Sequence, residues 1–154
     1  PPRMDTLQTR SAWPLARAHQ RLLAALGAAP GEPLAATRVD AALQTAARHR
    51  SRAMWPWETP PSSVAHGILD DETYDWLAVE RAMLTTGGRA LVADEPDLVR
   101  ANAIARATTG IDADETGTAG VAGLLALGAA GHLSPSESIA VVLSGVRRAQ
   151  PAEE

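Results

Sequence analysis

Residues 114–145 read DETGTAGVAGLLALGAAGHLSPSESIAVVLSG, and the expected architecture follows from this stretch. Between Gly117 and Gly131 nearly every residue is apolar or glycine, which predicts a helix that must be covered on every side. The run is shorter than the roughly 20 apolar residues that span a bilayer. We therefore expect a core helix packed closely against a sheet, with Gly131 ending it in the left-handed conformation.

A turn and a strand are expected after this helix. Residues 134–137, SPSE, have the pattern of a capping box with proline at the first helical position, so one short turn should follow. Residues 139–143, IAVVL, are apolar without alternation, as in a strand buried on both faces of a parallel sheet. Ligands of open α/β sheets bind beyond the carboxyl ends of the strands. Ser144 and Gly145 stand at that end, offering a hydroxyl and a close backbone approach.

The composition limits the classes of function. The 154 residues, of which 45% are apolar, suit one domain with its own core. Cysteine is absent, which excludes disulfides and thiolate metal sites and fits a cytoplasmic protein. The net charge of −4 and the scatter of the arginines argue against a nucleic-acid partner, and no long apolar span indicates a membrane. All fourteen basic residues are arginines, so the chain has no lysine.

The rest of the chain alternates strands with helices. The patterns predict strands at residues 4–9 and 89–93, and helices at residues 11–26, 37–50, 70–84 and 95–109. Ser11, Thr37 and Asp94 are the expected caps of three of these helices. The predicted fold class is α/β, with a small mostly parallel sheet flanked by helices.

Four polar or aromatic groups leave functional alternatives open. Residues 48–52 hold three arginines and His49, and we favour a solvated helix end over an anion site. We expect Trp55 and Trp57 in a loop that packs onto the core, and we favour this interpretation over a ligand wall or a dimer patch. The acidic run 70–72 is interpreted as a helix start instead of a catalytic carboxylate pair. His66 lacks partners at metal-ligand spacing.

Four segments occur in an order typical of one enzyme family: PRMDTLQTRSAWPLARA, GGRALVADEPDLVRANAIA, GIDADETGTAGVAGLLAL and AVVLSG. The chain resembles the C-terminal portion of the pyridoxal-phosphate enzymes of fold type II, most closely their threonine synthase branch. The resemblance covers most of the chain except about residues 30–84. It implies that residues 1–154 form one incomplete α/β domain, part of a larger three-layer αβα domain.

The resemblance also assigns site residues. In this family a Ser-Gly or Thr-Gly pair after a buried strand faces the pyridine nitrogen of pyridoxal 5'-phosphate, which places Ser144 and Gly145 there. A Thr-Gly pair opens the buried helix beside the cofactor, where backbone N–H groups point outward, which places Thr116 and Gly117 there. Asp114 and Glu115 depart from the residues usual before that pair. The implied reaction is elimination or replacement at the β or γ carbon of an amino acid, phosphohomoserine being one candidate, in a cytoplasmic homodimer.

The catalytic parts of such an enzyme are missing from this sequence. The family's Schiff-base lysine and glycine-rich phosphate loop lie upstream, and arginine cannot replace the lysine amine. We therefore expect an N-terminal half, in the same or a separate chain, whose strands pair with residues 4–9. The alternative function is a non-catalytic α/β interaction or regulatory module derived from this fold, which the missing lysine and the tryptophan loop favour.

Overall fold

The computed structural model describes residues 1–146 of the chain. The strands are β1 (Thr6–Thr9) and β2 (Ala90–Ala93). The α-helices are α1 (Pro14–Leu26), α2 (Ala36–Arg48), α3 (Trp76–Thr86), α4 (Glu95–Thr109) and α5 (Ala119–Ala129). Two short 3-10 helices are η1 (Arg50–Arg52) and η2 (His66–Ile68). Within the described residues, no helix is both long and apolar enough to cross a membrane.

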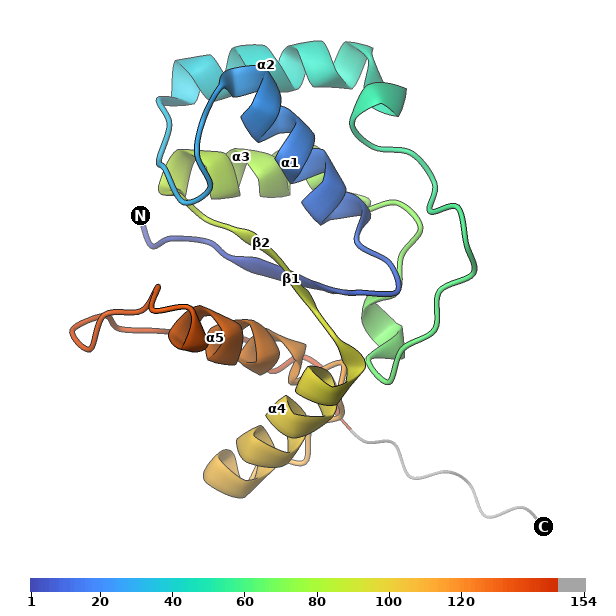
Figure 1. The fold of residues 1–154 in the computed structure, drawn as a ribbon, viewed down its shortest axis with the longest axis vertical. Coiled ribbons are helices and arrows are strands. Elements are labelled where there is room, and N and C mark those ends of the chain that lie inside the picture. The colour runs from blue at the N-terminus through green and yellow to red at the C-terminus, as the bar shows by residue number, and fades with distance from the viewer. Residues whose placement is uncertain (147–154) are drawn as a thin grey trace.

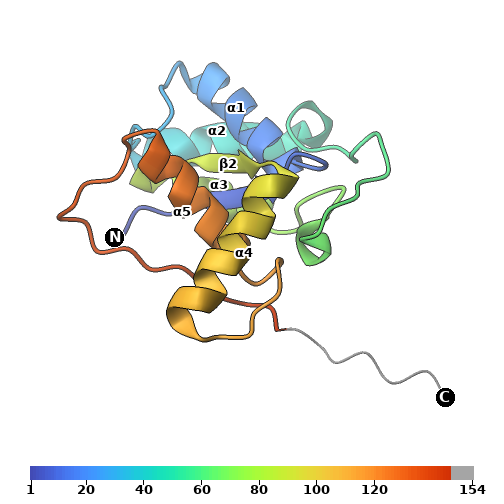
Figure 2. The same cartoon turned by 60° about the horizontal axis from the view of Figure 1, so that its bottom comes forward.

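The two strands form a parallel sheet between two layers of helices. Thr6 pairs with Ala90 and Thr9 with Ala93, so the strands run in register over their whole length. Helices α1, α2 and α3 lie on one side of the sheet, and α4 and α5 lie on the other (Figures 1 and 2). The predicted α/β class with a small parallel sheet flanked by helices is confirmed.

The layer of α1, α2 and α3 holds the larger core. Its side chains come from all three helices and from the segment after η1; among them are Leu22, Val39, Met54, Trp76, Met83 and Leu84. Proline at the first position of α1 has the backbone angle that a helix start requires, and Gly27 ends this helix with φ 58°. These local signals place α1 so that its apolar face turns inward.

The layer of α4 and α5 packs through small residues, as the glycine-rich pattern predicts. Ala101 of α4 and Ala119 and Ala122 of α5 belong to its core. A β-carbon at Gly123 would lie 3.1 Å from Leu91 Cδ1 and 3.3 Å from Leu7 Cδ1. Glycine therefore lets α5 approach the sheet closely. Gly131 has φ 70°, which confirms the predicted left-handed stop.

Two predictions are wrong within residues 1–146: helix α5 is not covered on every side, and no strand follows it. Gly120, Ala126 and Ala129 of α5 are exposed. Residues 139–143 are irregular and largely exposed, with Val142 80% accessible. This run passes beside α5, where Val141 Cγ1 would lie 3.0 Å from a β-carbon at Gly120. Because it reaches neither edge of the sheet, it has no strand with which to form a hydrogen-bonded ladder.

Several helix starts also differ from the prediction. Helices α1 and α2 begin after Trp13 and Ala35, and neither Ser11 nor Thr37 is a cap. Asp94 does precede α4, but its carboxylate accepts a hydrogen bond from Arg10 at 2.9 Å instead of capping. The acidic run 70–72 lies in the loop before α3, where Glu72 forms an ion pair with Arg50. Long-range partners thus take carboxylates that local rules assign to helix ends.

The tryptophan loop is pinned to α1, as the favoured interpretation predicts. The Arg17 guanidinium lies 3.6 Å from the centre of the Trp55 ring and donates to the Trp55 carbonyl oxygen at 2.7 Å. It also donates to both carboxylate oxygens of Glu58, at 2.9 and 3.1 Å. Trp57 packs against Trp13 with ring centres 5.2 Å apart. One arginine therefore anchors this loop through cation–π contacts with two tryptophan rings and three hydrogen bonds.

Candidate functional site

The turn before α5 is built by Asp114. Its carboxylate accepts a 2.6 Å hydrogen bond from the Gly117 N–H, and its carbonyl oxygen accepts bonds from the Thr118 N–H and hydroxyl, each at 3.0 Å. Both N–H groups at the helix start are therefore already bonded inside the protein. The expectation that they point outward toward a ligand is wrong for Gly117 and Thr118. Asp114, which departs from the residues usual at this position in the family that the sequence resembles, accepts the hydrogen bonds of both N–H groups.

A buried asparagine holds this turn from the side. Asn102 of α4 donates from its amide to the Ala113 carbonyl at 2.9 Å and to the Thr118 hydroxyl at 3.0 Å. Asn102 and Thr118 are both buried. The sequence analysis missed Asn102, although its spacing from Leu98 and Ala105 puts a polar residue on the apolar face of α4. Such a residue needs partners, and here they are the turn before α5.

Thr116 is fixed by the loop that contains η2. Its hydroxyl oxygen accepts a 3.0 Å hydrogen bond from the Gly67 N–H. A β-carbon at Gly67 would lie only 2.7 Å from Thr116 Cγ2, so glycine permits this approach. Gly67 also lines a hollow of about 400 Å³ whose walls include Leu7, Leu15 and Ile68. Thr116 therefore contacts a residue that lines this hollow.

The two pairs assigned by resemblance meet in the structure. Gly117 and Gly145 are so close that a β-carbon at Gly117 would lie 2.5 Å from the Gly145 nitrogen and 2.7 Å from its α-carbon. A β-carbon at Gly145 would in turn lie 2.8 Å from the Gly117 nitrogen. Both positions thus require glycine, for mutual backbone approach. The segment 144–146 is held across the head of α5.

Ser144 is exposed beside this contact. Within residues 1–146 its hydroxyl has no hydrogen-bond partner, so it is available to one outside them. Ser144 lines neither the hollow beside Gly67 nor the hollow at the end of α2. The structure therefore brings Thr116, Gly117, Ser144 and Gly145 to one place on the surface, without an enclosing wall around the serine.

Metal chemistry finds no support in the described part of the chain. No group of three or more histidine, aspartate or glutamate side chains that could hold a metal ion occurs there. His66 lies in η2.

The contact between Gly117 and Gly145 gives a direct test of the geometry. We expect Gly117→Ala to release segment 144–146 from α5, because the added methyl group overlaps the Gly145 backbone. Proteolytic cleavage within residues 142–146 should become about tenfold faster or more, the change that a loss of roughly 1.4 kcal/mol in local stability produces. Gly128→Ala is the control, because its β-carbon would meet only Leu133 Cδ1 at 3.6 Å. An unchanged rate of cleavage in Gly117→Ala would mean that the two glycines do not touch in solution.

This chain is similar to known proteins in its three-dimensional structure. No protein-family model matches the chain, and no curated protein matches it either. Among solved structures the chain is similar to a crystal structure of threonine deaminase from the organism abbreviated T.th., with a TM-score of 0.51 and 22% sequence identity. The match covers 89% of this chain and 54% of that chain, so the chain spans about half the length of the solved structure.

At this identity the match concerns the fold. The parallel strands between two helical layers are consistent with a domain of the fold type II pyridoxal-phosphate enzymes. The resemblance drawn from the sequence is thus supported at the level of this fold. The threonine synthase branch and the cofactor contacts of Thr116, Gly117, Ser144 and Gly145 stay predictions.

Proposed function

We propose that the chain is the C-terminal part of a pyridoxal-phosphate-dependent lyase of fold type II, acting on an amino acid by β- or γ-elimination or replacement. The observation that carries this proposal is the meeting of Gly117 with Gly145 at the head of α5. That contact brings Thr116 and Ser144 into one region, as the resemblance requires. A threonine-synthase-like reaction in a cytoplasmic homodimer is the finer form of the proposal.

The residues present fit one side of the cofactor. The exposed Ser144 hydroxyl can hydrogen-bond a pyridine nitrogen without protonating it, because a hydroxyl is a far weaker acid than a carboxyl. Bound pyridoxal phosphate supplies an electron sink for bonds broken at the α-carbon of an amino acid. Thr116 is held still by the Gly67 N–H and can line the ring edge. Gly117 and Gly145 contribute by their missing side chains, which keep the backbone close.

The remaining parts must come from a region outside this sequence. We propose that residues 1–154 are one incomplete α/β domain, completed by an N-terminal half in the same or a separate chain. That half would supply the lysine amine and the phosphate-binding loop, neither of which occurs among the 154 residues. In a two-stranded sheet each strand has one edge without a strand partner, so β1 offers an edge to that half. The same N-terminal half would also cover the exposed residues of α5.

Ser144→Ala tests the assignment in the protein produced from the whole gene. We expect about 2- to 10-fold weaker pyridoxal phosphate binding, corresponding to the roughly 0.5–1.5 kcal/mol of one hydrogen bond. The visible absorbance of the bound cofactor, followed during a titration, measures this. Ser138→Ala is a matched control, since Ser138 is also an exposed serine of the segment that follows α5. A whole protein that carries a lysine and shows no cofactor band would remove the proposal.

A second candidate is a non-catalytic interaction or regulatory module derived from the same fold. The open surroundings of Ser144 and the absence of lysine in the sequence favour it. It predicts that the melting temperature of the whole protein is the same with and without pyridoxal phosphate. An increase of several degrees at saturating cofactor would instead support the lyase, because a ligand stabilises only the state that binds it.

A further inference from the structure

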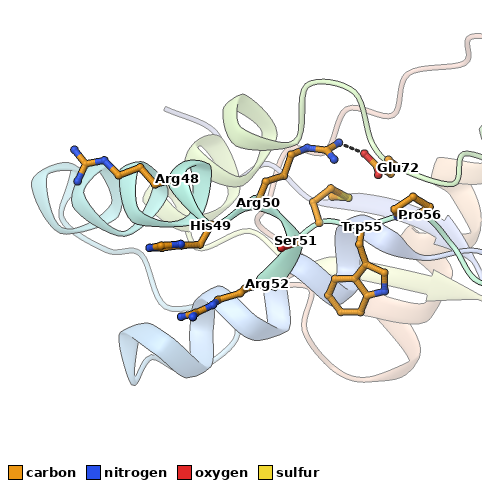
Figure 3. Close-up of a pocket in the computed structure, with 9 residues that line it drawn as sticks. Arg48, His49, Arg50, Ser51, Arg52, Trp55, Pro56 and Glu72 are labelled. Carbon is orange, nitrogen blue, oxygen red and sulfur yellow. Dashed lines mark ion pairs between the residues drawn. The ribbon is translucent and has the colours of Figure 1, made fainter.

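Basic side chains gather where α2 ends and η1 begins. Arg48, His49, Arg50 and Arg52 follow one another there and line a hollow of about 420 Å³ together with the Trp55 ring (Figure 3). All four basic side chains are exposed. The hollow is formed where α2 ends, and α2 lies on the opposite side of the sheet from α5 (Figure 1). It is therefore distinct from the candidate cofactor region.

Two more arginines extend this positive region through Trp55. The Arg17 guanidinium lies 3.6 Å and the Arg21 guanidinium 4.7 Å from the centre of the Trp55 ring. The region thus holds five arginines, and two carboxylates face them. Glu58 binds Arg17 and Glu72 binds Arg50. An excess of three positive charges remains here, in a chain whose formal net charge is −4.

The helix dipole accounts for only part of this excess. A cation near the last turn of α2 is favoured by the carbonyl groups there, which suits Arg48. Arg50 and Arg52 lie beyond that turn, in η1. Arg48 and Arg52 make no ion pair within residues 1–146. Their charge is left for a solute or a partner to neutralise.

We propose that this hollow binds a phosphate monoester. Guanidinium groups match phosphate oxygens with paired N–H donors, and a phosphate dianion would offset most of the local excess of charge. The hollow is larger than a phosphate group, which leaves room for an organic substituent beside Trp55 and Pro56. The Ser51 hydroxyl adds a neutral donor at the wall.

Side-chain mobility lets the arginines converge on the anion. In Figure 3, Arg48, His49 and Arg52 extend to one side of the hollow, whereas Arg50 reaches toward Glu72. Because Arg48 and Arg52 are exposed and unpaired, they reach a bound phosphate by rotamer changes that break no other ion pair. Arg50 can hold the phosphate while it keeps Glu72, since a guanidinium carries five N–H donors.

Titration of the full chain with phenyl phosphate, inorganic phosphate and benzoate tests the site. Calorimetry measures affinity, and the quenching of Trp55 emission reports where binding occurs. We expect dissociation constants on the order of a millimolar for phenyl phosphate, with weaker binding of inorganic phosphate and the weakest of benzoate. Trp55→Phe should abolish most of the fluorescence change, while calorimetry should still detect the heat of binding.

Two charge-matched variants decide between a site and general attraction. Arg48→Ser/Arg52→Ser should weaken phenyl phosphate binding by roughly tenfold or more, because it removes two charge-assisted partners. Arg100→Ser/Arg106→Ser removes the same charge from α4 and should change the affinity less than twofold. Equal loss in both variants would overturn the proposal, as would the absence of any phosphate binding. A polyglutamate peptide that binds while phenyl phosphate does not would also overturn it.

Discussion

His19→Ala is expected to lower the free energy of unfolding by about 3 kcal/mol, one of the two largest effects that the structure predicts. His19 of α1 and Glu80 of α3 form a buried pair, with His19 Nδ1 at 2.7 Å from Glu80 Oε2. Glu80 is fully inaccessible and His19 is 4% exposed. The other polar atom of each side chain, His19 Nε2 and Glu80 Oε1, is buried without a hydrogen-bond partner. Removing the imidazole leaves the whole carboxyl group without a partner inside an apolar layer.

The same pair makes stability depend on pH. Burial raises the pKa of the Glu80 carboxyl, and the hydrogen bond and charge of His19 oppose this increase only in part. In the unfolded chain the carboxyl loses its proton near pH 4.5. Glu80 therefore contributes most to stability below that pH, and its contribution falls as the pH rises toward the higher pKa of the folded state.

Glu80→Gln separates these effects. Its amide can donate to His19 Nδ1 but does not ionise, so this variant should lack the fall in stability that begins near pH 4.5. Urea unfolding from pH 4 to pH 8 of the wild type, His19→Ala and Glu80→Gln measures all three curves. Parallel curves for wild type and Glu80→Gln would show that Glu80 does not titrate in this range. Full stability of His19→Ala would show that the pair is not buried.

Gly88→Ala should destabilise the protein by a similar amount, about 3 kcal/mol. Gly88 is buried where the turn after α3 meets the chain entering β1. A β-carbon there would overlap the Met4 carbonyl group, at 2.8 Å from its carbon, and would lie 3.1 Å from Met83 Cα. These are backbone atoms, so no side-chain rotation relieves the overlap. The Gly88 N–H also donates to the Met83 carbonyl oxygen at 2.8 Å, which fixes the turn in place.

Thermal unfolding of Gly88→Ala beside Gly128→Ala measures this cost. Gly128 lies exposed in α5, and a β-carbon there would make only an ordinary contact with Leu133 Cδ1 at 3.6 Å. Alanine there should be neutral or stabilising by up to about 1 kcal/mol, because alanine favours the helix more than glycine does. A Gly88→Ala protein as stable as the wild type would mean that β1 does not enter past this turn.

Sequence reasoning succeeded where the physical signal is local. The helix stop at Gly131 needs only a residue that adopts positive φ without strain. It was less successful at helix starts, because Asp94 and Glu72 bond to arginines from other segments. The sequence could not indicate that Gly67 binds Thr116, because Gly67 donates through its backbone N–H and almost every residue has this group.

The sequence alone therefore determined the order of the two strands and five α-helices as far as α5, the close packing of α5 on the sheet and the lack of lysine and cysteine. Only the tertiary structure decided that residues 139–143 form no strand, that Gly117 meets Gly145 and that His19 meets Glu80. The physical reason is the range of the forces involved. Backbone preferences act within a few residues, whereas a strand, a backbone contact and a buried pair exist only where a distant segment supplies the other half.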